Sequence, residues 1–184
     1  MEHFYQNVEG WFTFPNIYKA VVEKLEGGLI VEVGTWMGQS AAFMAVEIVN
    51  SKKPFVFHCV DTWKGSEEHK DYDVIKNDEL YEKFLKNMES VKDVIVPVRK
   101  NSLEASKDYA DNSIDFLFLD AAHDYENVKA DLEAWYPKVK PGCIFAGHDY
   151  PYWEGVVRAV DEFCVERSYK VFLSEQSWGI KKKK

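Results

Sequence analysis

The segment from Leu29 to Ala42, LIVEVGTWMGQSAA, constrains the fold more than any other stretch of the chain. Its apolar run ends at Gly34, a second glycine follows at Gly38, and a small, helix-favouring stretch comes next. This order predicts a buried strand that turns sharply into a helix. Gly34 can adopt a backbone conformation that a β-carbon opposes, and Gly38 permits close approach of a ligand or of the helix itself. The free N–H groups and the dipole at the start of that helix predict a ligand site above the strand.

The acid Glu32 decides which ligand this turn favours. The turn lacks the Lys-Ser/Thr pair that serves a triphosphate, and its Gly-x-x-x-Gly spacing is not the Gly-x-Gly-x-x-Gly that binds a pyrophosphate. A carboxylate two residues before the first glycine repels phosphate and suits a ligand with a cationic amine. The alternative is a tight strand-to-helix connection with Glu32 at its rim.

The rest of the composition indicates one domain. The chain has 184 residues, of which 46% are hydrophobic, and it contains no run of eighteen apolar residues that could span a membrane. The segment MEHFYQNVEGWF lacks the basic start and the apolar core of an export signal. Cys59, Cys143 and Cys164 lie in apolar segments without metal-ligand spacing, which predicts buried thiols in a reducing compartment. A cytoplasmic location is therefore expected.

The net charge of −8 disfavours nucleic acid as a partner, because contacts to phosphate need a basic surface. Lys181 to Lys184 form the only basic cluster, and we expect a solvated tail or strand-end charge there.

Apolar runs and helical spacing alternate along the chain, which is typical of an α/β fold. Predicted strands cover 29–33, 55–61, 94–98, 114–119, 143–147, 169–174 and 178–182, and predicted helices include 16–25, 38–50 and 79–91. The aromatic stretch from Gly10 to Phe14 predicts packing or a lid. The polar loop 65–78 is longer than most connections in such a fold, and loops of that length tend to carry function. His69 within it is expected to be solvated.

Acids and a histidine follow three of these strands. Asp61 ends the second strand, where a carboxylate can accept hydrogen bonds from ribose hydroxyls, although a capping role is the alternative. Asp120 ends the strand 114–119, and His148 and Asp149 end the next one. Neighbouring parallel strands lie about 5 Å apart, so these side chains can converge. Two carboxylates brought together need a cation, and a divalent metal is the simplest one. Helix or turn capping is the other interpretation.

The motif E-x-G-x-x-x-G-x-S, here Glu32, Gly34, Gly38 and Ser40, resembles the first motif of the class I S-adenosylmethionine (SAM) methyltransferases. The variant is that of catechol-type and macrolide-sugar O-methyltransferases. The resemblance implies that the acid faces the methionine amine, and that the loop amides with the serine hold the methionine carboxylate. It also implies further cofactor contacts. Asp61 would bind the ribose, Thr62 and Trp63 would border the adenine, and Ser102 would contact the adenine ring.

The segments F-L-D-A-A-H-D-Y and P-G-x-x-x-x-G-H-D-Y resemble the metal-dependent O-methyltransferases, and the resemblance extends from about Gly10 to Tyr150. It implies a metal site at Asp120, His148 and Asp149. The catechol-type relatives carry an Asp-Asn pair where this chain has His148-Asp149. An all-oxygen site suits magnesium, whereas imidazole shifts the preference toward manganese, iron or other transition ions. His123 stands where those relatives place a lysine base, so it is the expected catalytic base; a helix cap or a metal ligand is the alternative.

The resemblance implies a Rossmann-like three-layer sandwich with strand order 3-2-1-4-5-7-6 and an antiparallel last strand. A single domain over residues 1–184 is expected, with an amino-terminal helix or lid at 1–26 and a loop-helix insert at 65–91. The implied function is transfer of a methyl group from SAM to a hydroxyl of a small molecule, with magnesium or manganese. A sugar hydroxyl, a catechol-like diol and a polyketide hydroxyl all remain open as acceptors, and the pattern predicts neither a membrane partner nor an oligomeric state.

Two other functions are compatible with parts of the pattern. A metal-dependent hydrolase or oxygenase could use His123, His148 and a carboxylate, although that leaves Glu32, the glycine turn and Asp61 unexplained. A non-catalytic SAM-binding module is the second. Thermal shifts with SAM, with metal and with both distinguish the three.

Overall fold

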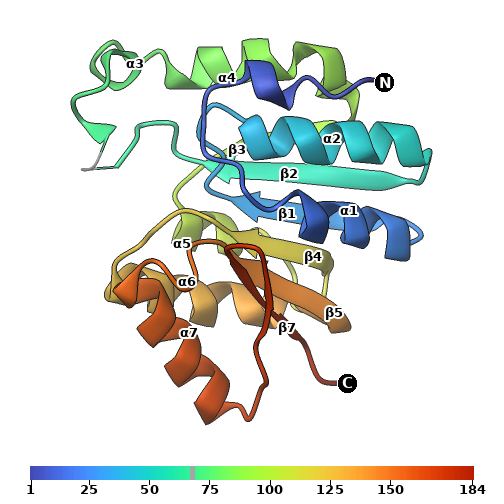
Figure 1. Ribbon diagram of the computed structural model, residues 1–184, viewed down its shortest axis with the longest axis vertical. Helices are drawn as coiled ribbons and strands as arrows, with labels where there is room; N and C mark the ends of the chain where they lie inside the picture. The colour runs from blue at the N-terminus through green and yellow to red at the C-terminus, as the bar shows by residue number, and fades with distance from the viewer. Residues whose placement is uncertain (67–68) are drawn as a thin grey trace.

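The computed structural model describes residues 1–66 and 69–184, and the chain folds around a seven-stranded sheet (Figure 1). Its strands are β1 (Gly28–Val33), β2 (Phe55–Asp61), β3 (Ile95–Arg99), β4 (Ile114–Leu119), β5 (Val139–Gly147), β6 (Phe172–Ser174) and β7 (Ser177–Lys181). The order across the sheet is β3-β2-β1-β4-β5-β7-β6. The first five strands pair in parallel, and β7 runs antiparallel to both β5 and β6. The predicted α/β fold, strand order and antiparallel last strand are confirmed.

Helices cover both faces of this sheet, which is why its central strands are apolar on both sides. The helices are α1 (Pro15–Lys24), α2 (Gln39–Ser51), α3 (Asp73–Lys76), α4 (Leu80–Met88), α5 (Ser102–Ser106), α6 (Tyr125–Trp135) and α7 (Glu154–Glu166), with short 3-10 turns at Tyr5–Asn7, Glu89–Val94 and Tyr136–Lys138. One core lies between the sheet and α1, α2 and α4, and the second lies between the sheet and α5, α6 and α7. In β1, Ile30 enters the first core, while Val31 and Val33 enter the second.

Two element boundaries differ from the sequence prediction. The predicted helix 79–91 is divided into α4 and a 3-10 turn, and residues 67 and 68 of the predicted insert lie outside the described residues. Pro141 and Gly142 do not follow a helix end directly, because they lie inside β5. They occupy a register shift against β4, where the pair Ile114↔Val139 is followed by Phe116↔Ile144. Such a bulge accommodates a proline, which cannot donate to a regular ladder.

The C-terminal lysines are part of the fold. Lys182 Nζ donates hydrogen bonds to the carbonyl oxygens of Tyr136, Pro137 and Val139 at 3.2, 3.2 and 2.7 Å. Lys183 Nζ donates to the carbonyl oxygen of Arg167 at 2.8 Å. These contacts satisfy backbone acceptors that follow α6 and α7. The expectation of a solvated tail is therefore wrong for Lys182, which is half-buried among these carbonyl oxygens, whereas Lys183 stays exposed and both lysines directly follow the end of β7.

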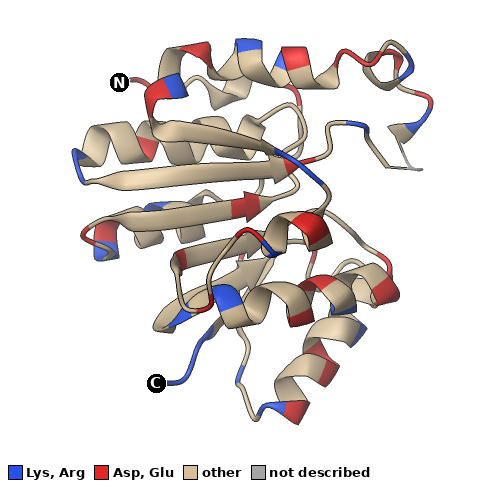
Figure 2. Ribbon diagram, turned by 180° about the vertical axis from the view of Figure 1, so that it is seen from behind, with Lys and Arg blue, Asp and Glu red and all other residues tan. Residues whose placement is uncertain are grey.

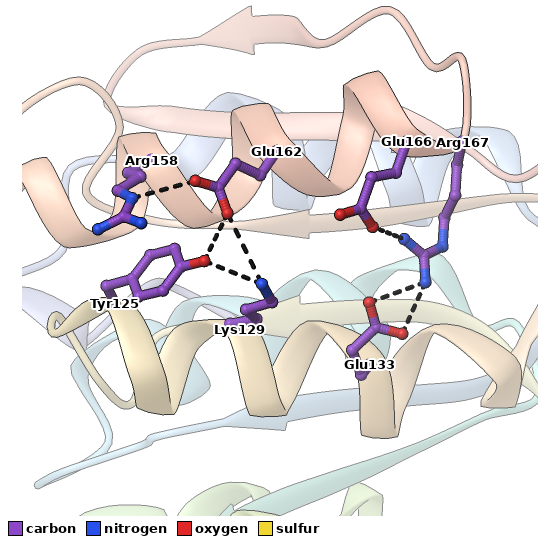
Figure 3. Close-up of polar contacts among 7 residues, drawn as sticks. All are labelled: Tyr125, Lys129, Glu133, Arg158, Glu162, Glu166 and Arg167. Atoms are coloured by element: carbon purple, nitrogen blue, oxygen red, sulfur yellow. Dashed lines mark hydrogen bonds and ion pairs between the residues drawn. The ribbon is translucent and has the colours of Figure 1, made fainter.

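Side chains on α6 and α7 join the two helices along their length (Figure 3). The Tyr125 phenol donates to Glu162 at 2.5 Å, and Arg158 donates to the same carboxylate at 3.0 Å. The Arg158 guanidinium also lies 3.9 Å from the centroid of the Tyr125 ring. One turn before the end of α6, Glu133 accepts two hydrogen bonds from Arg167, at 2.8 and 2.6 Å. Exposed pairs contribute little one at a time, but a connected set of this kind fixes the orientation of α7 against α6.

Acidic and basic residues are mixed along the outer helices, and the C-terminal segment is basic (Figure 2). Among the described residues, no helix combines the length and the apolar character needed to cross a bilayer. All three cysteines are free, and Cys59 and Cys164 are buried as predicted. Cys143 is only half-buried, although its apolar sequence neighbours predicted a buried thiol.

Candidate functional site

A cavity of about 540 Å³ opens at the carboxyl ends of β1, β2, β4 and β5. Its volume is in the range of small-molecule and cofactor sites. The lining includes most of the residues predicted from the sequence, namely Gly34, Ser40, Asp61, Thr62, Ser102, Asp120, His123, His148 and Asp149. The predicted donor loop and the predicted acidic cluster therefore belong to one cavity.

The turn after β1 depends on both of its glycines. Gly34 has a φ of +90°, and a β-carbon there would lie 2.1 Å from the carbonyl oxygen of Asp120. The ends of β1 and β4 can thus approach closely only because Gly34 has no side chain. Gly38 has a φ of +91°, and its β-carbon would lie 2.8 Å from Met88 Cε and 3.1 Å from the Phe84 ring. Gly38 therefore makes room for α4 and does not line the cavity among the described residues.

Glu32 lies fully buried beneath this turn. Ser40 Oγ donates a short hydrogen bond to Glu32 Oε1. Burial raises the pKa of the Glu32 carboxyl to about 8; the Ser40 hydrogen bond opposes this rise and the charge of Asp120 adds to it. The nearby Tyr18 hydroxyl also lowers the pKa of Glu32. Neither Tyr18 OH nor Glu32 Oε2, however, has a hydrogen-bond partner within bonding geometry among the described residues. The acid predicted to face an amine thus has one oxygen without a partner in the described structure.

Two further polar atoms of the same segment are buried without a partner among the described residues. They are Thr35 Oγ1 and Trp36 Nε1. Buried polar groups in native proteins are almost always satisfied, so orphaned atoms gathered in one segment require an explanation. Thr35 and Trp36 both line the cavity, which places their residues where a ligand would lie.

Asp61 organises the backbone around the turn. Its Oδ2 accepts hydrogen bonds from the amides of Thr35 and Trp36, each at 2.9 Å, and its Oδ1 accepts one from the amide of Trp63 at 2.8 Å. The carboxylate therefore joins the end of β2 to the turn after β1. It also lines the cavity, as expected for a ribose-binding acid, and its Oδ1, which accepts only one of these hydrogen bonds, keeps acceptor capacity for a ligand.

Trp63 does not border the cavity in the described structure, contrary to the sequence prediction. It is fully buried against Tyr81 and Phe84, with ring centroids 4.8 and 4.7 Å away. Its indole Nε1–H donates to the carbonyl oxygen of Trp36 at 2.9 Å, which supports the turn from below. Position alone could not reveal this, because a left-handed backbone at Trp63, with a φ of +50°, directs the side chain into the core. Thr62 does line the cavity.

Ser102 lines the cavity, but its hydroxyl is directed toward α6. Ser102 Oγ donates to Asp131 at 2.5 Å and accepts from Trp135 Nε1 at 2.7 Å. Asn101 caps α5 by accepting from the amide of Glu104, as the sequence predicts. Contact of Ser102 with an adenine ring stays a prediction. Because the hydroxyl is already bonded to α6, the backbone and the Cβ of Ser102 would have to make that contact.

Three side chains form a potential metal site at the other end of the cavity. Asp120, His123 and Asp149 each offer one ligand atom, and these atoms lie within 4.8 Å of one another. His123 Nε2 is 2.9 Å from Asp149 Oδ2. Asp124, and not His123, caps α6, because its side chain accepts from the amide of Asn127. The structure thus groups His123 with the two acids and removes the capping interpretation of His123.

His148 lies behind this cluster. Its Nδ1 is 3.3 Å from Asp120 Oδ1 and 3.4 Å from Asp149 Oδ1, and its Nε2 is 2.9 Å from Thr13 Oγ1. Both ring nitrogens therefore have partners within the protein. The sequence predicted His148 as a metal ligand, but in this arrangement its ring nitrogens contact the two carboxylates and Thr13.

The charges of the cluster are strongly coupled. Burial would lower the pKa of His148, but its contacts with Asp120 and Asp149 outweigh burial and raise the pKa to about 10. Burial raises the pKa of Asp120 to about 6, against the lowering effect of His148. For Asp149, burial is outweighed by contacts with His123 and His148, and its pKa falls well below the ordinary value. At neutral pH the His148 imidazolium thus balances part of the carboxylate charge.

Several residues of the site could not be identified from the sequence pattern. Thr13 Oγ1, besides its contact with His148, donates to Gln176 Oε1 at 3.1 Å. Phe14 is fully buried, whereas Trp11 is 57% exposed and lines the cavity. The aromatic amino-terminal stretch therefore packs into the core through Phe14 and borders the cavity through Trp11. Trp11 also approaches Trp36, with ring centroids 6.0 Å apart. The aromatic composition of 10–14 was the available signal, but it does not reveal which ring faces the cavity.

His69 and Trp153 are two further members of the lining that the sequence pattern did not predict. His69 packs against Trp36 at a centroid distance of 4.5 Å and is half-buried, so the expectation of a solvated side chain is wrong. Trp153, just before α7, stacks on His123 with centroids 4.4 Å apart and an interplanar angle of 16°. Neither residue carries a spacing signal that would have predicted these contacts.

Comparisons with known proteins agree with this arrangement. The family model described as "Methyltransferase domain" matches residues 31–150. An uncharacterized protein, y4gI, of Sinorhizobium fredii (strain NBRC 101917 / NGR234) is 30% identical over 147 residues, which make up 80% of this chain but only 16% of that protein. The chain therefore spans about a sixth of the length of this relative.

Two solved structures share the fold. The O-methyltransferase NovP has a TM-score of 0.68 at 16% identity, covering 92% of this chain and 79% of its own. CalS11, a TDP-rhamnose 3'-O-methyltransferase of calicheamicin biosynthesis, has a TM-score of 0.62 at 19% identity, covering 91% of this chain and 76% of its own.

Proposed function

The chain belongs to the methyltransferase family, with the class I SAM-dependent fold, and on that premise we propose that it methylates a hydroxyl group of a small molecule with the help of a divalent metal ion. One observation carries the proposal. A single cavity joins the glycine turn, which has unsatisfied polar atoms at Thr35 and Trp36 and covers the buried Glu32, to a cluster of two carboxylates and one imidazole. A donor of methyl groups suits the first end, and a metal with a hydroxyl acceptor suits the second.

The residues of the first end fit SAM. Glu32 Oε2, Thr35 Oγ1 and Trp36 Nε1 are buried and unsatisfied, so a bound ligand would complete their hydrogen bonding. Glu32 provides a carboxylate for the methionine amine, and ionisation of that carboxylate is favoured once a cation lies beside it. Asp61, on the second strand, lies where the ribose hydroxyls are expected.

The residues of the second end fit a divalent metal. Asp120, His123 and Asp149 supply two oxygens and one nitrogen within a span of 4.8 Å. Carboxylates suit magnesium or manganese, and an imidazole ligand shifts the preference toward manganese and other transition ions. When bound, such an ion lowers the pKa of an acceptor hydroxyl and fixes its oxygen for attack on the methyl group.

The chain itself orients the reactants and handles the proton. SAM is already an activated donor, so methyl transfer needs alignment more than covalent help from the protein. His123 can accept the proton of the hydroxyl as a general base. Asp149 Oδ2, 2.9 Å from His123 Nε2, holds the ring in place and stabilises the imidazolium that results. If His123 is instead a metal ligand, an oxygen of the cluster must accept the proton.

The acceptor lies, in this proposal, beside the aromatic wall formed by Trp11, Trp36 and His69 and opposite the acidic cluster. These three side chains line the same cavity. Rings of this kind favour a flat or ring-shaped acceptor through stacking, which leaves both sugars and aromatic diols possible. The net charge of −8 makes nucleic acid an unfavourable acceptor.

Thermal-shift and turnover measurements test the proposal together. SAM should stabilise the protein, Mn²⁺ should stabilise it separately, and a panel of hydroxylated small molecules should yield S-adenosylhomocysteine in the presence of both. Stabilisation by metal alone, without any effect of SAM, would support a metal-dependent hydrolase or oxygenase. Stabilisation by SAM without turnover across the panel would support a SAM-binding module and contradict the enzymatic proposal.

A further inference from the structure

We infer that Trp153 is a positioning residue that holds the His123 ring in the orientation the site requires. The indole and imidazole planes are nearly parallel, at 16°, with centroids 4.4 Å apart. The inference rests on the proposed function only in assigning His123 to the reacting end of the cavity.

His123 needs such a constraint because of where it lies. It belongs to the connection between β4 and α6, outside any helix or strand. Rotation about the last side-chain torsion of histidine is broad and only weakly limited by the backbone. The contact with Asp149 fixes the direction of Nε2, and the stack on Trp153 fixes the plane of the ring. The two contacts together define one orientation.

Trp153 is itself held relative to both partners. Its amide donates to the carbonyl oxygen of Asp149 at 3.1 Å. Two residues later, a β-carbon at Gly155 would lie 2.3 Å from the carbonyl oxygen of His123 and 2.7 Å from the amide nitrogen of Tyr125. The first turn of α7 therefore packs directly on the backbone that carries His123. The bonds between α6 and α7 drawn in Figure 3 maintain this packing along both helices.

Exposure distinguishes this tryptophan from those of the core. Trp63, Trp135 and Trp178 are fully buried, whereas Trp153 is 42% exposed and lines the cavity. An indole left so open adds little to the stability of the core. Among the described residues, the ring that stacks on its face is His123, at the edge of the site.

Crystal structures of Trp153→Ala and Trp153→Phe, together with Mn²⁺ calorimetry on each protein, test the inference. We expect the Ala variant to lose the 2.9 Å contact between His123 Nε2 and Asp149 Oδ2. If His123 is a metal ligand, this variant should also bind Mn²⁺ about two- to tenfold more weakly, since a stacked pair contributes about that much; if His123 is the base, its Mn²⁺ affinity should equal that of the wild type. The Phe variant, which keeps a stacking face, should retain both. Tyr152→Ala, which truncates the neighbouring exposed ring, should match the wild type.

SAM affinity and the melting temperature separate the possible outcomes. Both should stay at wild-type values in the Trp153 variants, because neither the donor end nor the core is changed. A His123 side chain that keeps its position in Trp153→Ala would overturn the inference, whatever happens to turnover. Absence of SAM binding in the wild-type protein would count against the proposed function, and the His123 position in the variant structures would still decide the role of Trp153.

Discussion

The hydroxyl of Ser40 donates to Glu32 Oε1, while Oε2 of the same carboxylate has no hydrogen-bond partner among the described residues. A buried acid held in this half-satisfied state is costly to ionise, and its pKa rises to about 8. A ligand that brings a cation to Oε2 reverses that preference. The donor site is therefore expected to couple binding to ionisation of Glu32.

Glu32→Gln should weaken SAM binding about 10- to 150-fold, because a hydrogen bond to a charged group contributes about 1.5–3 kcal/mol. The glutamine keeps the acceptor for Ser40 and removes only the charge. Isothermal titration calorimetry measures the change. Glu47→Gln, on α2 but paired with His3 outside the cavity, is the matched control and should bind SAM as the wild type does. Equal affinities in the two variants would show that Glu32 does not face the amine.

The same substitution should alter how stability depends on pH in the absence of ligand. Glu32 has a folded-state pKa of about 8 against an ordinary value of 4.5, so between these values the folded protein holds a proton that the unfolded chain has released. Glu32 therefore lowers the free energy of unfolding as pH rises through this window, by a few kcal/mol in order of magnitude. The melting temperature of Glu32→Gln relative to wild type should climb from pH 5 to pH 8. A constant difference across that range would contradict the assignment.

Asp61→Ala should weaken SAM binding and also lower the melting temperature by roughly 3–12 °C, because it removes a charged acceptor worth about 1.5–3 kcal/mol. The amides of Thr35, Trp36 and Trp63 all lose their partner. Calorimetry and differential scanning fluorimetry report the two effects. Asp93→Ala, at an exposed position of a 3-10 turn, should change neither. Unchanged SAM affinity in Asp61→Ala would restrict Asp61 to its structural role.

Asp120→Asn and Asp149→Asn should each abolish turnover while SAM affinity stays nearly intact, because the cluster serves the acceptor more than the donor. Excess EDTA should reproduce the loss in the wild-type enzyme, and added Mn²⁺ should reverse it. Glu166→Gln, at an exposed position at the end of α7 and outside the cavity lining, is the charge-matched control. Full turnover in EDTA would refute the metal assignment.

His123→Ala distinguishes a base from a metal ligand. If His123 is the base, His123→Ala should lower turnover roughly 10²–10⁴-fold and leave Mn²⁺ affinity unchanged. His123→Lys should then retain partial activity, with its pH profile moved to alkaline values. As a ligand, its loss should weaken Mn²⁺ binding, and excess metal should restore much of the rate. Initial rates at several pH values and metal concentrations separate these cases. Wild-type turnover in His123→Ala would exclude both roles.

The sequence pattern predicted the sheet because apolar runs and helical spacing are local properties. Residues 29–33 and 114–119 could be predicted as buried strands from their apolar runs, and Asp120 at a carboxyl end, whereas the strand order was implied by the family resemblance. Convergence of Asp120 and Asp149 also followed, since parallel strands end at the same edge of a sheet. The motif around Gly34 was recognisable because a tight turn needs glycine whatever surrounds it.

Contacts between distant segments could not be predicted in this way. Thr13 and His148 are separated by 135 positions, and no periodicity connects them. His148 resembled a metal ligand by position, but Thr13 and the two carboxylates take up both of its nitrogens, which depends on where the amino-terminal segment lies. The family resemblance placed Trp63 at the adenine, whereas a left-handed backbone directs its side chain into the core.

The Thr13–Gln176 contact has a consequence for synthesis of the protein. The residues that line the cavity run from Gly10 to Gln176, and the turn at Gly34 itself packs against the carbonyl of Asp120. Neither end of the cavity can therefore be complete before β4 has joined the sheet, and the contact of Thr13 with Gln176 forms only after almost the whole of this chain has been synthesised.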